Sequence, residues 1–190
     1  MMNNKKVPCW VWNKLIDDKV INHINHVIRN SELEPEIRES GGLYPDGSEK
    51  KNCTANWVQL GYVPDLQNII NAAFMINQEI FGYNLYPITP YKKGLYQDYD
   101  ESNEAKYDWH SDESSSQISD TKLSFIINLS ENTYKGGDFL LGYPEEECLE
   151  MFNNPGSAIL FKSHILHKVT PVIKGNRKTL TIFLEGPKFT

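Results

Sequence analysis

The sequence predicts an α+β fold in a single domain, with helices first and a β sandwich or jelly roll after them. The chain has 190 residues, which suits one domain with a proper core. Helical spacing of apolar residues occurs in the first half, whereas short β-branched, aromatic and aliphatic runs separated by turns follow residue 90. We therefore treat 1–190 as one domain, with helical support in 1–90 and the β core in 91–190.

Two helices are predicted in the first part. The segment 12–28 has the spacing of an amphipathic helix, with an apolar face made by Ile16, Val20, Ile24, Val27 and Ile28. The segment 64–81 opens with Pro64 and Asp65 and has a comparable apolar stripe. The Gly- and Ser-rich segment 40–52 between them is predicted to be a loop, and 56–63 is predicted to be extended.

Five strand-like runs follow in the second part. They read GLYQDY, LSFIINL, GDFLLGY, GSAILF and KTLTIFLEG, at residues 94–99, 123–129, 137–143, 156–161 and 178–186. Each run is rich in the residue types that favour strands, and turn residues separate the runs. This spacing favours the jelly roll.

Composition excludes several classes of protein. The net charge of −6 argues against a general nucleic-acid binder. No run of 18 apolar residues is present, which argues against a membrane span, and the N-terminal residues contain no apolar core of a signal peptide. Cys9, Cys53 and Cys148 are odd in number and widely spaced, so we expect reduced thiols in a cytoplasmic protein.

A candidate metal site begins at the stretch YDWHSDES, residues 107–114. His110 and Asp112 are two residues apart, so on extended chain both side chains point to the same side and suit Fe(II), Mn(II) or Zn(II). A third ligand is needed, and His164 and His167 are the candidates. They face opposite ways on a strand, because three residues separate them, so only one can face the core. His23 and His26, by contrast, fit the polar edge of the first helix.

A single arginine stands out in the second part. Arginine occurs only at Arg29, Arg38 and Arg177, and every other basic residue is lysine. Where a point charge suffices, this chain uses lysine, so Arg177 suggests a need for the planar fork that binds a carboxylate through two hydrogen bonds. A surface salt bridge is the alternative explanation.

These residues together resemble a known family. The pattern Y-x-x-H-x-D, then G-G-D/E-F/L, then H-x-V-x-P-V-x-x-G-x-R-x-S/T is similar to that of prolyl-4-hydroxylase-like Fe(II)- and 2-oxoglutarate-dependent oxygenases, particularly bacterial and phage members. The matching residues are Tyr107, His110, Asp112; Gly136, Gly137, Asp138, Phe139; His167, Val169, Pro171, Val172, Gly175, Arg177 and Thr179. The resemblance covers residues 91–190 and includes the ending Gly186-Pro187.

The resemblance implies a double-stranded β-helix core and a set of site residues. It implies Fe(II) bound by His110, Asp112 and His167, and 2-oxoglutarate and O2 as co-reactants, with ascorbate as a reductant. It implies that Arg177 and Thr179 bind the distal carboxylate of 2-oxoglutarate. Tyr99 and Asn128 are further expected contacts in the same pocket, and the loops 41–52 and 113–120 are candidate lids on the substrate side.

The implied function is hydroxylation of a C–H bond, with release of succinate and CO2. A carboxylate at Asp112 predicts hydroxylation, since halogenating relatives have a small residue there. The predicted substrate is a peptidyl proline of a cytoplasmic protein. Alternatives are a free amino acid or other small molecule, nucleic-acid demethylation, which the family's second arginine (here Phe183) would favour, and a non-catalytic jelly-roll metal-binding module. The sequence does not determine the oligomeric state.

Overall fold

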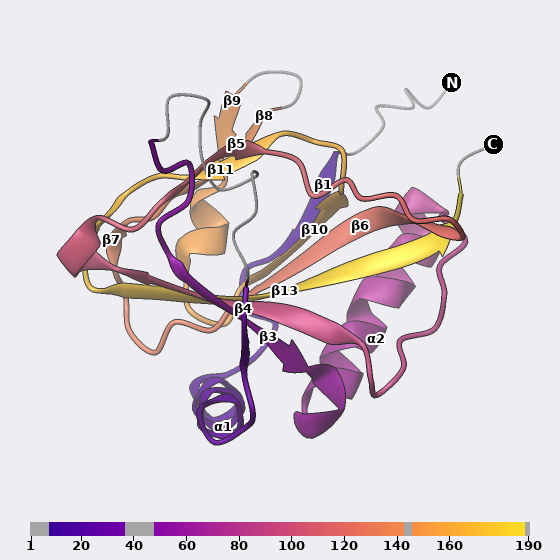
Figure 1. Ribbon diagram of the computed structural model, residues 1–190, viewed down its shortest axis with the longest axis horizontal. Helices are drawn as coiled ribbons and strands as arrows, with labels where there is room; N and C mark the ends of the chain where they lie inside the picture. Colours follow the sequence, from indigo (N-terminus) through magenta and orange to yellow (C-terminus); the bar gives the residue numbers. More distant parts are fainter. Residues whose placement is uncertain (1–7, 37–47, 143–145, 189–190) are drawn as a thin grey trace.

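The computed structural model describes residues 8–36, 48–142 and 146–188, which form three layers (Figure 1). The middle layer is a seven-stranded antiparallel sheet. Helices α1 (Asp18–Arg29) and α2 (Leu66–Ile76) cover one face of this sheet, and a four-stranded sheet lies over the other face. This is the α+β arrangement that the sequence predicts, with two facing sheets as the jelly-roll core.

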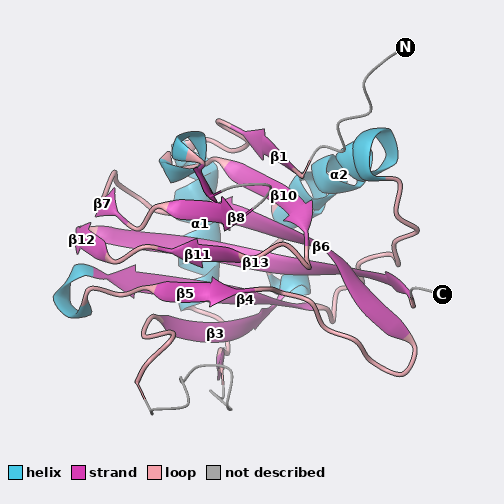
Figure 2. Cartoon of the chain, turned by 90° about the horizontal axis from the view of Figure 1, so that it is seen from above, coloured by secondary structure: helices cyan, strands magenta, loops and turns pink. Residues whose placement is uncertain are grey.

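The strands belong to three sheets (Figure 2). The large sheet has the order β1 (Cys9–Trp12), β10 (Ala158–Lys162), β6 (Ser119–Asn128), β13 (Asn176–Pro187), β4 (Lys93–Asp100), β3 (Thr54–Gln59) and β2 (Glu34–Pro35). The second sheet has the order β5 (Tyr107–His110), β11 (His167–Val169), β8 (Phe139–Gly142) and β9 (Glu146–Cys148). A small ribbon joins β12 (Val172–Lys174) to β7 (Lys135–Gly136).

Helix α1 forms because its start is capped and one face is apolar. The Asp17 carboxylate accepts a hydrogen bond from the Val20 amide at 2.9 Å, which satisfies one of the donors left over at a helix start. Ile21, Ile24 and Ile28 are buried against the large sheet. Helix α2 also buries one apolar face, but the side chain of its N-cap residue Asp65 makes no capping hydrogen bond. It continues as a π turn (Asn77–Phe81) that ends at Gly82, whose φ is 70°.

The side chains of strand β6 contribute to two hydrophobic cores, one on each face of the large sheet. Its side chains alternate between the faces, so Phe125 and Ile127 pack under the helices, whereas Ile126 faces the second sheet. The second core contains Tyr99, Phe139 and other apolar residues between the sheets. The space between the two sheets is therefore the place for a site.

Several predicted boundaries need correction. The first helix begins at Asp18 rather than at residue 12, because Trp12 lies in β1 and pairs with Ala158 of β10. The segment 1–90 contributes more than helices, since β1, β2 and β3 all belong to the large sheet. The predicted loop 113–120 is shorter than expected, because Ser119 and Asp120 are buried in β6.

The second predicted helix and the five predicted strand runs are confirmed as α2 with its π turn and as β4, β6, β8, β10 and β13. Three-residue helical turns follow β3 and β4, at Leu60–Tyr62 and Glu101–Asn103, and a four-residue turn spans Glu150–Asn153. Most of the candidate lid 41–52 lies outside the described residues. Among the helices that are described, none combines the length and the hydropathy of a membrane span.

Candidate active site

A cavity of about 770 Å³ opens between the two sheets. Its floor is made by alternate residues of β4 and β13, including Gln97, Tyr99, Arg177, Thr179 and Thr181. These side chains share one face because β4 and β13 are paired and side chains alternate along each strand. The facing wall contains His110, Asp112 and His167.

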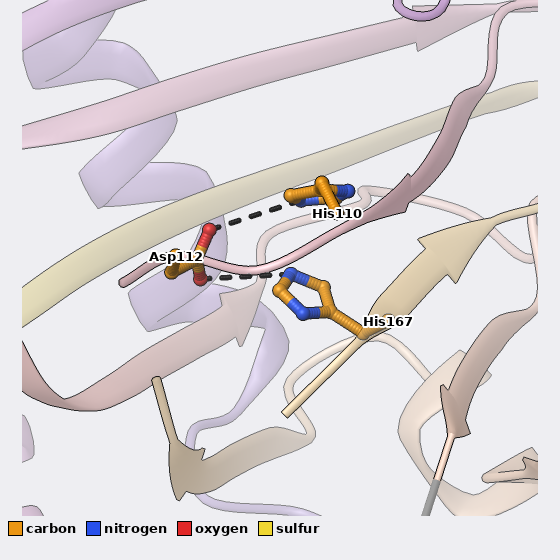
Figure 3. Close-up of side chains that lie close together, drawn as sticks. All are labelled: His110, Asp112 and His167. Carbon is orange, nitrogen blue, oxygen red and sulfur yellow. Dashed lines mark ion pairs between the residues drawn. The ribbon is translucent and has the colours of Figure 1, made fainter. Parts of the chain in front are cut away.

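The two histidines and the aspartate converge on one point (Figure 3). His110 and His167 lie opposite each other on the paired strands β5 and β11. The Asp112 amide donates to the Ser163 carbonyl at 2.9 Å, which holds the chain just after β5. His110 Nε2 is then 3.7 Å from Asp112 Oδ1, and His167 Nε2 is 3.5 Å from Asp112 Oδ2.

Backbone carbonyls fix the tautomer of both rings. His110 Nδ1 lies 2.7 Å from the Asp108 carbonyl oxygen, and His167 Nδ1 lies 3.0 Å from the Ile165 carbonyl oxygen. A carbonyl can only accept, so each Nδ1 carries the proton and each Nε2 presents a lone pair to the centre. Burial, with a smaller contribution from His167, lowers the pKa of His110 to about 2, so this ring is neutral.

This donor set fits a divalent cation. The three ligand atoms all lie within 4.8 Å of one another. Asp112 Oδ2 is buried and has no hydrogen-bond partner in the described part of the protein, which is costly for a carboxylate unless a cation neutralises it. Two imidazoles and one carboxylate on one side of a centre leave its other side open, as in the two-His-one-carboxylate sites of non-haem iron.

Arg177 presents an unsatisfied cation at the other end of the floor. Its side chain is 1% exposed, and its Nε has no hydrogen-bond partner among the described residues. Its guanidinium lies over aromatic rings, with Cζ 5.1 Å from the Tyr99 centroid and 5.6 Å from the Phe152 centroid. A buried guanidinium with spare donors is suited to an anion, and a carboxylate matches its fork.

The Gly136-Gly137 pair makes room for this arrangement. Both glycines have φ near +65°, in the left-handed region that other residues rarely adopt: 68° at Gly136 and 65° at Gly137. A Cβ on Gly137 would lie 3.0 Å from Arg177 Cδ, and one on Gly136 would lie 2.2 Å from the Pro171 carbonyl oxygen. The motif therefore lets the chain pass closely behind Arg177.

The structure separates the predicted site residues into two groups. His110, Asp112, His167, Arg177, Thr179 and Tyr99 all line the cavity. His164 is exposed and does not, which resolves the choice that the sequence left open. Asn128 needs correction: its amide donates to Tyr134 Oη at 3.0 Å and to the Phe152 carbonyl at 2.9 Å, so it holds the protein together beside the cavity rather than lining it.

Among the cavity residues that the sequence analysis did not predict, Lys51 and Gln97 contact side chains at or beside the predicted site. Lys51 is almost fully buried, pairs with Glu36 and lies over the Tyr107 ring, which stacks on His110 with 3.4 Å between centroids. Gln97 lies two residues before Tyr99 on β4 and donates to its hydroxyl at 3.0 Å. Strand alternation could have found Gln97, whereas nothing in the sequence places Lys51 beside β5.

Comparison with known proteins agrees with this geometry. The family model of the 2OG-Fe(II) oxygenase superfamily matches residues 95–185, which contain the three converging side chains and Arg177. Over these residues, which are just under half of the chain, the protein is similar to the 2OG-Fe(II) oxygenase superfamily. This similarity implies Fe(II), 2-oxoglutarate and O2, and the donor set described above suits the metal and a carboxylate cosubstrate.

Individual proteins that are similar in sequence or fold include hydroxylases. A PKHD-type hydroxylase of Synechococcus sp. (strain CC9605) is 36% identical over 81 residues, which are 42% of this chain and 36% of that protein's length. The crystal structure of a Pseudomonas putida prolyl-4-hydroxylase matches with a TM-score of 0.68 at 16% identity, covering 95% of this chain and 94% of the other. A Trichoplax adhaerens prolyl hydroxylase, solved with a hypoxia-inducible-factor peptide, matches with a TM-score of 0.65 at 14% identity, covering 95% and 84%. These structures show that the fold is the double-stranded β-helix.

Proposed function

We propose that this oxygenase hydroxylates a C–H bond with Fe(II), 2-oxoglutarate and O2, and that its substrate is a peptidyl proline of a cytoplasmic protein. The observation that carries the proposal is the placing of two unsatisfied groups in one cavity. Asp112 Oδ2 is suited to bind a cation, and Arg177 Nε is suited to bind an anion. An iron ion with a dicarboxylate cosubstrate supplies both.

In this proposal each site residue has a distinct role. His110 and His167 bind Fe(II) through Nε2, and Asp112 binds it through its carboxylate. Arg177 binds the distal carboxylate of 2-oxoglutarate through its fork, with the Thr179 hydroxyl beside it, and Tyr99 is a further contact. Bound iron, with 2-oxoglutarate and O2, supplies the oxidising power to hydroxylate an unactivated C–H bond and yields succinate and CO2.

The protein's own contribution is position and the exclusion of water. Ile126, Phe139 and Val169 line the cavity with apolar surface, so its charged groups act in a poorly screened environment. The backbone hydrogen bonds of the two imidazoles keep both Nε2 atoms aimed at the centre without rearrangement. Ascorbate as a reductant stays a prediction.

Two observations support a peptide substrate over a nucleic acid. The cavity mouth is lined by Glu34, Glu36, Glu113 and Glu185, and a phosphate backbone would meet these carboxylates. Lys51, Lys92 and Lys93 also line the mouth and pair with Glu36, Glu185 and Glu34, so the mouth keeps a small excess of carboxylate and its three lysines are already engaged. The peptide in the Trichoplax structure shows that this fold can accommodate a peptide, which supports the same use here.

The cytoplasmic location rests on the odd number and wide spacing of the cysteines.

The first test is turnover of the cosubstrate. We expect purified protein with Fe(II), 2-oxoglutarate and O2 to form succinate slowly alone and faster with proline-containing peptides, as followed by mass spectrometry. His167→Ala is expected to abolish succinate formation, because it removes one of three ligands.

His164→Ala is the matched control, since this exposed histidine lies three residues before His167 on the same segment. Equal succinate formation by the parent and His167→Ala would contradict the proposed function. Metal binding without any use of 2-oxoglutarate would favour the non-catalytic metal-binding module.

A further inference from the structure

A row of hydrogen-bonded side chains crosses the cavity floor beside the predicted cosubstrate site. Thr181 Oγ1 lies 3.3 Å from Gln97 Oε1, and Gln97 Nε2 lies 3.0 Å from Tyr99 Oη. All three side chains line the cavity and are at least nine-tenths buried. They come from adjacent strands, because Gln97 and Tyr99 are on β4 and Thr181 is on β13.

The orientation of the Gln97 amide controls what the Tyr99 hydroxyl can do. The amide has one accepting end and one donating end. Thr181 engages the oxygen, so the nitrogen is turned toward Tyr99 and donates to the phenol oxygen. A phenol that accepts through its oxygen still has its own proton to donate. Gln97 therefore leaves Tyr99 as a donor.

We propose that Gln97 is a positioning residue, which holds the Tyr99 hydroxyl as a hydrogen-bond donor to a carboxylate oxygen of bound 2-oxoglutarate. This inference rests on the proposed function, because it assumes that 2-oxoglutarate binds in this cavity. Gln97 acts through Tyr99 and does not itself need to touch the cosubstrate.

The surroundings of Tyr99 agree with this role. Burial raises the pKa of Tyr99 well above its ordinary value, so the phenol keeps its proton. The Arg177 guanidinium lies over the Tyr99 ring, so an anion bound by Arg177 is close to the tyrosine. Cys53 is the other group against the Tyr99 hydroxyl, and its sulfur is a weak acceptor that a carboxylate oxygen outcompetes.

The test is a double-mutant cycle on 2-oxoglutarate binding without turnover. The dissociation constant is measured for the Fe(II)-loaded protein in the absence of oxygen, from the visible band that forms on chelation. The variants are Gln97→Met, which keeps the volume but loses the amide, Tyr99→Phe, and both together. Gln59→Met on the neighbouring strand β3 is the control, because Gln59 does not line the cavity.

We expect Gln97→Met to weaken 2-oxoglutarate binding about fivefold to tenfold, the usual worth of one hydrogen bond. In the Tyr99→Phe background the same change is expected to have little effect, because Gln97 then has no hydroxyl to orient. Mn(II) affinity is expected to stay the same in all variants, since the metal ligands are untouched. If Gln97→Met unfolds, Gln97→Asn is the second variant: it keeps a neutral amide but is one methylene shorter, so it cannot bridge Thr181 and Tyr99, and it is expected to show the same dependence on Tyr99.

Three results would overturn the inference. One is that Gln97→Met weakens 2-oxoglutarate binding equally in the parent protein and in the Tyr99→Phe variant. This would mean that Gln97 acts independently of the Tyr99 hydroxyl. Another is unchanged or tighter binding by Gln97→Met, which would mean that the amide does not direct the phenol proton toward the cosubstrate. Failure of the parent protein to bind 2-oxoglutarate would remove the proposed function together with this inference, and so is distinguishable from the other two.

Discussion

At the scale of single residues, the site is defined by groups that the protein alone leaves unsatisfied. Most buried polar atoms in folded proteins have a partner, so the buried atoms Asp112 Oδ2 and Arg177 Nε are informative. Asp112 Oδ2 lies 3.5 Å from His167 Nε2, and the Arg177 guanidinium lies over the rings of Tyr99 and Phe152. The negative charge of Asp112 and the positive charge of Arg177 each determine the charge of the ligand that is expected to bind beside them.

Replacing Arg177 by lysine tests whether the fork is needed rather than the charge alone. We expect Arg177→Lys to weaken 2-oxoglutarate binding about tenfold to hundredfold, because a lysine cannot form the bidentate pair. Isothermal titration with Mn(II) in place of Fe(II) measures this. Arg29→Lys is the control, since Arg29 pairs with Glu131 on the surface. An affinity unchanged by Arg177→Lys would show that a point charge suffices.

The sequence predicted which side chains converge in the cavity, but it did not predict their supporting contacts. His110 and Asp112 could be found because strand geometry puts residues i and i+2 on one side. The role of Asn128 could not be predicted, because its partners Tyr134 and Phe152 come from other parts of the chain. Its strand position alone suggested the cavity, and only the folded structure shows that its donors are occupied.

At the scale of elements, one buried polar side chain fixes helix α1 to the large sheet. Asn25 is fully buried on the apolar face of the helix. Its amide donates to the Leu129 carbonyl at 2.8 Å, and its oxygen accepts from Tyr96 Oη at 3.1 Å. These bonds set the position of α1 along β6 and β4, on the face opposite the cavity.

Asn25→Ala is expected to lower the free energy of unfolding by about 1–3 kcal/mol, because it leaves the buried Leu129 carbonyl and Tyr96 hydroxyl without their partner. Urea denaturation measures this. Asn22→Ala on the same helix is the control, since Asn22 is exposed, and it is expected to change stability little. A stability of Asn25→Ala equal to that of the control would contradict the role given to this network.

The long elements were predictable and the short ones were not. α2, β6 and β13 have enough residues for a periodic pattern to emerge. β5 and β11 have four and three residues, too few for alternation to be recognised, yet they carry His110 and His167. The start of α1 was misplaced because Trp12 continues the apolar spacing of the helix while pairing in β1 with a strand far along the chain.

At the scale of the whole molecule, the large sheet separates support from chemistry. One face packs against the helices and has an apolar core, and the other faces the second sheet and carries the cavity. The floor presents the candidate anion site from β4 and β13, and the opposite wall presents the candidate metal site from β5, β11 and the residues after β5. Pairing of strands distant in sequence thus brings the two sites together.

The joint presence of the two sites is tested most directly by the visible charge-transfer band of protein mixed with Fe(II) and 2-oxoglutarate without oxygen. The band forms only when Fe(II) and 2-oxoglutarate bind together at one centre. We expect the band in the parent and in His164→Ala, and a strong reduction in His167→Ala. Absence of the band from well-folded parent protein, or its full retention in His167→Ala, would contradict the assignment of this cavity as an iron and 2-oxoglutarate site.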